Sequence, residues 1–148
     1  MRSNQKGFTL IEILVVIGIL AVLFAIVLVA INPARQFAQA NNTKRQSDVN
    51  AMLNAIHEYA ADNKGTLPAG ITNTVQTISD TGANICSNLV TTYIAALPVD
   101  PSVNNGNPVA SCSGTYNTGY TVVKSATDNR VTVSAPDAEL GSTITVTR

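Results

Sequence analysis

The sequence predicts an α+β fold, in which one long N-terminal helix carries a small head with a three-stranded antiparallel sheet. Three observations support this prediction. An apolar run fills the first part of the chain, a helical period of apolar residues returns at Val49, and alternating apolar residues with turn signals fill the C-terminal third. With 148 residues, the chain has room for one small domain beyond the apolar run.

The apolar run extends from Phe8 to Ile31, and its only polar residues are Thr9 and Glu12. At about 1.5 Å per residue, the part after Glu12 would span about 28 Å as a helix, close to the hydrocarbon thickness of a bilayer. A core helix would be shorter and would carry a polar stripe, and no convincing signal-peptidase site follows the run. We therefore predict a membrane-spanning helix, because a lone span must satisfy its backbone hydrogen bonds internally.

The charges that flank this span do not orient it. Basic residues lie on both sides, with Arg2 and Lys6 before the run and Arg35, Lys44 and Arg45 after it. The two cysteines, Cys86 and Cys112, both fall in the predicted head. A cysteine pair in a small exported domain favours a disulfide in an oxidising compartment, although two unpaired thiols remain the alternative. We therefore predict a cytoplasmic N-terminus and an external head.

Glu12 is an ionisable residue at the edge of the span. Thr9 and Glu12 have the spacing of a capping box, and an acid in the first turn complements the helix dipole. Capping does not explain Lys6 and Gly7 in front of them. A carboxylate at a membrane boundary is also a candidate functional residue.

Residues 6–12, Lys-Gly-Phe-Thr-Leu-Ile-Glu, resemble the signature of the type IV pilin and pseudopilin family. The resemblance implies a leader over residues 1–7, with Arg2 and Lys6 as its basic residues. It implies that a membrane prepilin peptidase cleaves between Gly7 and Phe8 and then methylates the new amine of Phe8. It also implies the lollipop architecture of the family.

Physical chemistry fits these roles. Gly7 lacks a Cβ, so the backbone there can lie extended in a protease cleft. Cleavage would create a cation on Phe8 in apolar surroundings, and Glu12 of a neighbouring subunit would neutralise it. Because desolvation offsets much of this attraction, we expect the pair to set subunit register rather than to add raw stability.

The helix has two candidate positions for a kink, or for melting in a fibre, namely Gly18 and Pro33. Residues 34–48 are polar nearly all round, which predicts a solvated stem helix. We expect Lys44 and Arg45 to face solvent, with anionic lipid head groups or acids of other subunits as alternative contacts.

An apolar helical face begins at Val49 and predicts half of the core of the head; its members are Val49, Met52, Leu53, Ile56 and Ala60. Gly65 should end this helix. Residues 66–85 predict a loop, and residues 87–96 predict a short helix.

Three strand signals follow, at residues 120–124, 130–134 and 142–147, with turn residues between them. The alternation of apolar and polar residues in these strands predicts an antiparallel meander. One face of this sheet should be exposed to solvent, and the other, apolar face should pack on the helix. The inward residues should be Tyr120, Val122, Val131, Val133, Ile144 and Val146.

Residues 97–101, Leu-Pro-Val-Asp-Pro, with Gly106 to Pro108, look like a stretched form of a segment of major secretion pseudopilins. The tryptophan usual in that segment is absent, since the chain has none, and extra residues are inserted. These departures weaken an assignment to a secretion system.

No catalytic or metal site is predicted, because one histidine and two cysteines form no zinc pattern and no serine has a recognisable base. The head acids lack EF-hand spacing and are expected to be solvated turn residues, namely Asp100, Asp128, Asp137 and Glu139. Major secretion pseudopilins often bind Ca²⁺ in a head loop, which leaves calcium as the alternative to having no cofactor. The slightly acidic head does not favour nucleic acid as a partner.

We therefore predict a non-enzymatic structural subunit of a type IV pilus-like filament. Its parts are a leader (1–7), a transmembrane and filament-core helix (8–33), an amphipathic stem (34–64) and a globular head (65–148). The expected partners are prepilin peptidase, an inner-membrane assembly platform, membrane lipid before assembly and further copies of the chain. The subunit should span the cytoplasmic membrane once before it joins a cell-surface filament.

Three alternatives remain open. The chain could be the major pseudopilin of a type II secretion system, which would form a periplasmic piston. It could be a competence pilin, although the head lacks the basic patch that DNA binding needs. From another class, it could be a single-span anchored extracellular binding module, which would need neither the cleavage site nor Glu12.

Overall fold

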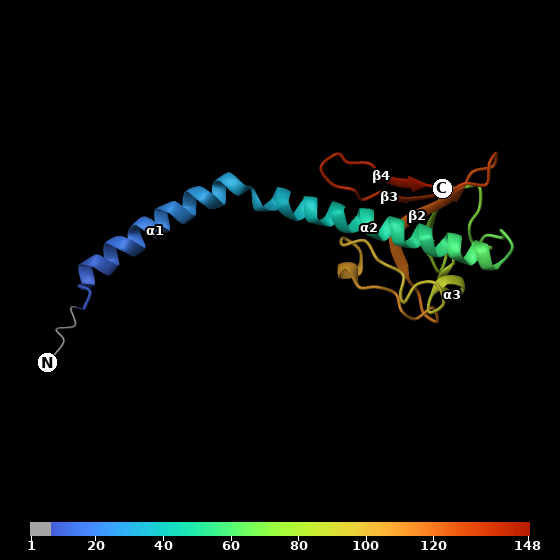
Figure 1. Ribbon diagram of the computed structural model, residues 1–148, viewed down its shortest axis with the longest axis horizontal. Coiled ribbons are helices and arrows are strands. Elements are labelled where there is room, and N and C mark those ends of the chain that lie inside the picture. The colour runs from blue at the N-terminus through green and yellow to red at the C-terminus, as the bar shows by residue number, and fades with distance from the viewer. Residues whose placement is uncertain (1–6) are drawn as a thin grey trace. The chain divides into compact units, whose positions relative to one another are not determined.

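The computed structural model describes residues 7–148, so Arg2 and Lys6 of the predicted leader lie outside the described residues. In chain order the elements are α1 (Leu10–Ile31), α2 (Pro33–Asp62), β1 (Gln76–Ser79), α3 (Cys86–Leu89), the 3-10 turn η1 (Asn104–Gly106), β2 (Asn117–Lys124), β3 (Val131–Ala135) and β4 (Ile144–Thr147) (Figure 1). The backbone divides into two compact units, one ending at Phe37 and one from Ala38 to Arg148. The fold is α+β, as predicted, with four strands instead of three.

The two long helices are separated at Asn32. α1 ends there because Asn32 adopts a left-handed conformation (φ 48°), which asparagine tolerates better than most residues. Asn32 also starts α2, since its carbonyl and side-chain oxygens accept from the Arg35 N–H at 3.1 and 3.3 Å. Pro33 then occupies the first helical position, where its missing N–H is not needed. α1 runs through Gly18 without a break, so melting at Gly18 stays a prediction.

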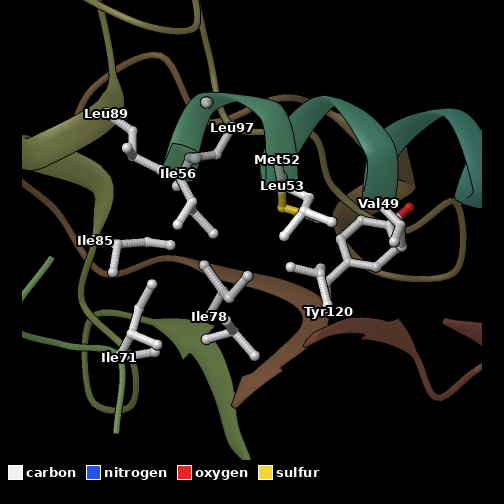
Figure 2. Packing of buried hydrophobic residues seen from close by; sticks show 14 of the residues in the cluster. Val49, Met52, Leu53, Ile56, Ile71, Ile78, Ile85, Leu89, Leu97 and Tyr120 are labelled. Atoms are coloured by element: carbon white, nitrogen blue, oxygen red, sulfur yellow. The ribbon is translucent and has the colours of Figure 1, made fainter. Parts of the chain in front are cut away.

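The core of the head lies between one face of α2 and one face of the sheet (Figure 2). From α2, Val49, Met52 and Ile56 are fully buried, and Figure 2 shows them pointing toward Ile78 of β1 and Tyr120 of β2. Leu53 is fully buried in the same cluster, whereas Ala60 is only partly buried. The predicted apolar face of the stem is therefore confirmed from Val49 to Ile56.

The sheet is an antiparallel meander with strand order β1-β2-β3-β4. Val133 pairs with Val122 on one side and with Val146 on the other, so inward residues are neighbours across the strands. The opposite face carries hydroxyl pairs, such as Thr132 with Thr147 at 2.8 Å between their Oγ1 atoms. The three predicted strands and their apolar face are confirmed.

Two predictions before the sheet are wrong. Residues 66–85 contain β1, which pairs with β2 and buries Ile78 in the core. The helix expected over residues 87–96 is only the four-residue α3, because Val90 is extended (ψ 138°) and Thr91 has φ 73°. A turn follows, in which the Thr91 N–H donates to the Ile94 carbonyl at 2.9 Å. β-Branched side chains in sequence at 90–92 disfavour helix, which accounts for the early end.

Cys86 and Cys112 are joined by a disulfide, with their Cα atoms 5.6 Å apart. Cys86 begins α3 and is fully buried, whereas Cys112 lies in an irregular segment before β2. Between them, the only bridges outside named strands in the described chain are Val90 with Ile94 and Leu97 with Val109. The crosslink therefore constrains a region with little regular structure.

Replacing both cysteines by alanine is expected to lower the free energy of unfolding by roughly 3–4 kcal/mol, because the open loop gains conformational entropy in the unfolded chain. Urea unfolding of the full chain in detergent micelles measures this loss. The single variant Cys112→Ala is the control, and it should lose nearly as much, since it removes the same bond. Alkylation of both thiols without prior reduction, seen by mass spectrometry, would contradict the pairing.

Candidate functional site

A capping box lies at the start of α1. The Glu12 N–H donates to Thr9 Oγ1 at 3.3 Å, while Glu12 Oε2 accepts from the Thr9 N–H at 2.7 Å and from its hydroxyl at 2.8 Å. Both halves of the reciprocal arrangement are therefore present. The interpretation of Thr9 and Glu12 as a helix cap is confirmed. Both bonds to the carboxylate use Oε2, so the other oxygen, Oε1, can accept a further donor.

The predicted cleavage site lies just before this cap. Gly7 and Phe8 precede the helix in an exposed, non-helical segment, and Phe8 is 84% exposed. A Cβ placed on Gly7 would meet no atom within 4 Å in the described chain. The peptide bond between these residues is thus accessible to an enzyme, as a cleavage site must be.

The surface of α1 is apolar on every side. None of its residues is buried by the described part of the chain, and its mean hydropathy is 3.4. α1 is the one helix among the described residues that is long and apolar enough to cross a membrane. A patch of this size needs a cover of lipid or of other apolar helices. Glu12 is the only charged residue within that surface.

A second constellation, which we call the Arg45 cluster, consists of Asn41, Asn42, Arg45, Asp100 and Glu139. The guanidinium of Arg45 forms a bidentate pair with Asp100, from Nε to Oδ2 at 2.7 Å and from Nη2 to Oδ1 at 3.0 Å. Its Nη1 donates to Glu139 Oε2 at 2.7 Å and to Asn42 Oδ1 at 3.1 Å. Arg45 is 1% exposed and Asp100 is completely buried. One side chain of α2 therefore binds two segments distant in sequence.

Asn42 holds the backbone of the loop between β3 and β4. Its Nδ2 donates to the Glu139 carbonyl at 2.8 Å, and its Oδ1 accepts from the Glu139 N–H at 2.9 Å. Asn41 Nδ2 donates to Glu139 Oε2 at 3.0 Å. Backbone and side chain of Glu139 are thus both fixed to α2.

The segment that carries Asp100 is held against β2. The Asp100 N–H donates to the Thr118 carbonyl at 2.8 Å, and Asp100 Oδ1 accepts from the N–H and hydroxyl of Ser102. Gly119 (φ 76°) allows this approach, because a Cβ there would lie 2.9 Å from the Asp100 Cβ and 2.9 Å from a Val103 methyl carbon. Glycine is therefore required at 119 both for the backbone conformation and for space.

The pKa values in the cluster follow from these bonds. The Asp100 hydrogen bond raises the pKa of Arg45, and it outweighs the effect of burial. Burial by itself raises the pKa of Asp100, but hydrogen bonds from Arg45 and Ser102 reverse the shift and lower it. Hydrogen bonds from Arg45 and Asn41 lower the pKa of Glu139. All three groups are therefore held in their charged forms.

Arg45 and Asp100 are not on the surface, where the sequence predicted them. Arg45 was expected on a solvated face, and Asp100 and Glu139 among solvated turn acids, yet Arg45 and Asp100 are buried. The missed signal is periodicity, since Arg45 lies four residues before Val49 and so on the same helix face as the core. Lys44 is partly exposed, and its Nζ forms an ion pair with Asp48 at 2.7 Å and donates to the Val99 carbonyl at 2.9 Å.

The calcium alternative can be tested against the donor groups present. Among residues 7–148, no group of three or more histidine, cysteine or acidic residues could hold a metal ion. Asp100 directs both carboxylate oxygens at Arg45, and Glu139 directs Oε2 there. Asp128 instead accepts from the Arg130 N–H at 3.2 Å in its own turn. Asp100, Glu139 and Asp128 therefore accept hydrogen bonds from groups of the chain itself.

Comparison with known proteins adds two matches. Residues 2–28 match the family model described as the prokaryotic N-terminal methylation motif. The chain is 35% identical over 107 residues to type II secretion system core protein G of Escherichia coli strain K12, and the match covers 70% of each chain. No solved structure matches.

Acid is expected to destabilise the head through the Arg45 cluster. The pKa values of Asp100 and Glu139 are lowered by folding from ordinary values near 3.8 and 4.5. Their contribution is therefore complete above about pH 5 and is lost as the pH falls through the lowered values. Urea unfolding of the full chain in detergent at a series of pH values measures this loss.

The variant Asp100→Asn provides the comparison for this pH series. It should lose about 3 kcal/mol at neutral pH, because the buried Arg45 is left with only the partly exposed carboxylate of Glu139, and its stability should fall less steeply in acid. Equal acid dependence in both proteins would contradict the assignment.

Proposed function

The chain belongs to the type IV pilin and pseudopilin family and is a filament subunit; we propose that its filament is a type IV pilus-like fibre assembled from the cytoplasmic membrane. One observation carries this proposal. Glu12 is the single charge on an otherwise apolar helix, and its capping bonds leave one carboxylate oxygen free for a partner. A helix that needed only a membrane anchor would not require this carboxylate.

Maturation begins with the leader in this proposal. A prepilin peptidase on the cytoplasmic side cleaves between Gly7 and Phe8 and methylates the amine of Phe8. The exposed, non-helical segment at these residues supports this step. The methylation motif matched over residues 2–28 supports it independently.

Assembly then depends on the new cation. The Phe8 amine of one subunit pairs with Glu12 of a neighbour, while the apolar surface of α1 passes from lipid to a bundle of identical helices. Both surroundings are apolar, so an inner-membrane assembly platform can extract the helix without exposing it to water. The buried pair sets the axial register of each incoming subunit rather than contributing most of the stability. Gly18 and Pro33 are the positions at which the helix can unwind or bend in the fibre.

The head has a structural role in this proposal and no catalytic one. It lies outside the cytoplasm, where the disulfide between Cys86 and Cys112 is stable, and the N-terminus lies inside. Heads of successive subunits then cover the outside of the fibre.

A second candidate is a major pseudopilin of a type II secretion system, which would form a short periplasmic filament. Similarity to core protein G of such a system favours it. The stretched segment from Leu97 to Pro108, in a chain without tryptophan, favours the pilus. Electron microscopy of sheared cell surfaces, with mass spectrometry of the filament subunit, distinguishes the two.

Co-expression with a prepilin peptidase should remove residues 1–7 and leave an N-methylated Phe8. Intact-mass and N-terminal peptide mass spectrometry measure both changes. The matched control is Gly7→Val, whose branched side chain should hinder an extended backbone in the protease cleft and leave the chain uncut. An uncut wild-type chain would favour the anchored binding module instead.

Glu12→Gln is expected to leave membrane insertion and cleavage intact and to abolish filaments, because the amide cannot neutralise the Phe8 cation. Thr9→Val is the matched control, since it removes the capping hydroxyl and keeps the carboxylate. It should still form filaments. Filament yield is measured by shearing and electron microscopy, and normal filaments from Glu12→Gln would refute the register role.

A further inference from the structure

We propose that the guanidinium of Arg45 is the built-in cation of the head, filling an oxygen cage so that the subunit folds without a divalent metal ion. The cage is the set of oxygen atoms that accept from Arg45, namely Asp100 Oδ1 and Oδ2, Glu139 Oε2 and Asn42 Oδ1. This inference concerns the folding of the head and stands independently of which filament the subunit builds.

The cage is built for a cation. Two carboxylates and an amide oxygen converge from three parts of the head, and the donor–acceptor distances to Arg45 lie between 2.7 and 3.1 Å. Asp100 is completely buried, so its charge could not remain there without a positive partner. The same donor types, carboxylate and amide oxygens, are those that Ca²⁺ prefers.

Arg45 satisfies the cage from inside the chain. Its planar fork of N–H donors reaches both oxygens of Asp100 and one of Glu139 at the same time, which a lysine ammonium cannot do. It approaches from α2, so it also ties both segments to the stem, 55 residues from Asp100 and 94 residues from Glu139. A metal ion in the same place would join the two segments but would reach α2 only through the Asn42 oxygen.

The head should therefore be indifferent to chelators, and removing Arg45 should make it responsive to calcium. Arg45→Ala leaves two carboxylates and the Asn42 oxygen facing a vacated space, in which Ca²⁺ can partly neutralise them. Lys44→Ala is the matched control. It removes the same charge from the adjacent position and also the bond from Lys44 Nζ to the Val99 carbonyl beside Asp100, at 2.9 Å, but it leaves Arg45 in the cage.

The experiment measures the thermal midpoint (Tm) of the full chain in detergent micelles, with chelator or with millimolar CaCl₂ or MgCl₂. The Tm of the wild type should not change between the three conditions, within error. The Tm of Lys44→Ala should likewise not change between them. Arg45→Ala with chelator should lose about 10 °C or more, and calcium should restore part of that loss. Magnesium should restore less, because it demands a tighter octahedral geometry.

Three results would overturn the proposal. One is a fall in the wild-type Tm with chelator. Another is an Arg45→Ala Tm that calcium does not raise. The third is a rise in the Tm of Lys44→Ala with calcium that equals the rise seen for Arg45→Ala. If Arg45→Ala does not fold in any condition, Arg45→Lys replaces it, and the proposal then requires a lowered Tm in a protein that keeps the charge but loses the fork.

Discussion

The apolar surface of α1 is the constraint on which the rest of this chain depends. None of the residues of α1 is buried by the described part of the chain, so its cover must come from lipid or from other copies of the helix. The core of the head is made of residues from Val49 to Ile144, so the unit from Ala38 onward must be stable through its own contacts. Membrane insertion and filament formation are then two ways to cover the same surface.

The head meets this demand with three kinds of constraint. An apolar core joins one face of α2 to the sheet, a disulfide fixes the irregular segment between α3 and β2, and the Arg45 cluster ties two loops to α2. Replacing a buried ion pair by apolar residues is often neutral, whereas removing one partner is costly. The cluster therefore matters less for total stability than for holding the Asp100 and Glu139 segments in one arrangement.

Strong periodic signals in the sequence predicted most of the fold. The apolar run, the face from Val49 to Ile56 and the alternation in the three C-terminal strands depend on local patterns, which the structure preserves. β1 was not predicted, because its four residues show too little alternation of apolar and polar side chains to indicate a strand. It forms a strand through its pairing with β2. The helical period places Arg45 on the core face, but the cluster as a whole was missed for a related reason. Its partners lie far apart in sequence, and the burial of a charge becomes favourable only when all of them meet. The N-terminal motif was readable because its residues are contiguous.

Glu12 can serve a single subunit and a filament without changing its place. In the single chain, one oxygen of its carboxylate completes the cap of α1 through Thr9, which compensates the N–H groups that a helix start leaves unpaired. In the filament proposed above, the second oxygen accepts from the Phe8 amine of a neighbour while those bonds persist. A carboxylate offers about four acceptor positions, so the two roles need not compete. The cap would also fix the carboxylate before the neighbour arrives, which reduces the entropy lost when the pair forms. A glutamine keeps an acceptor oxygen for the cap but has no negative charge for the amine of the neighbour.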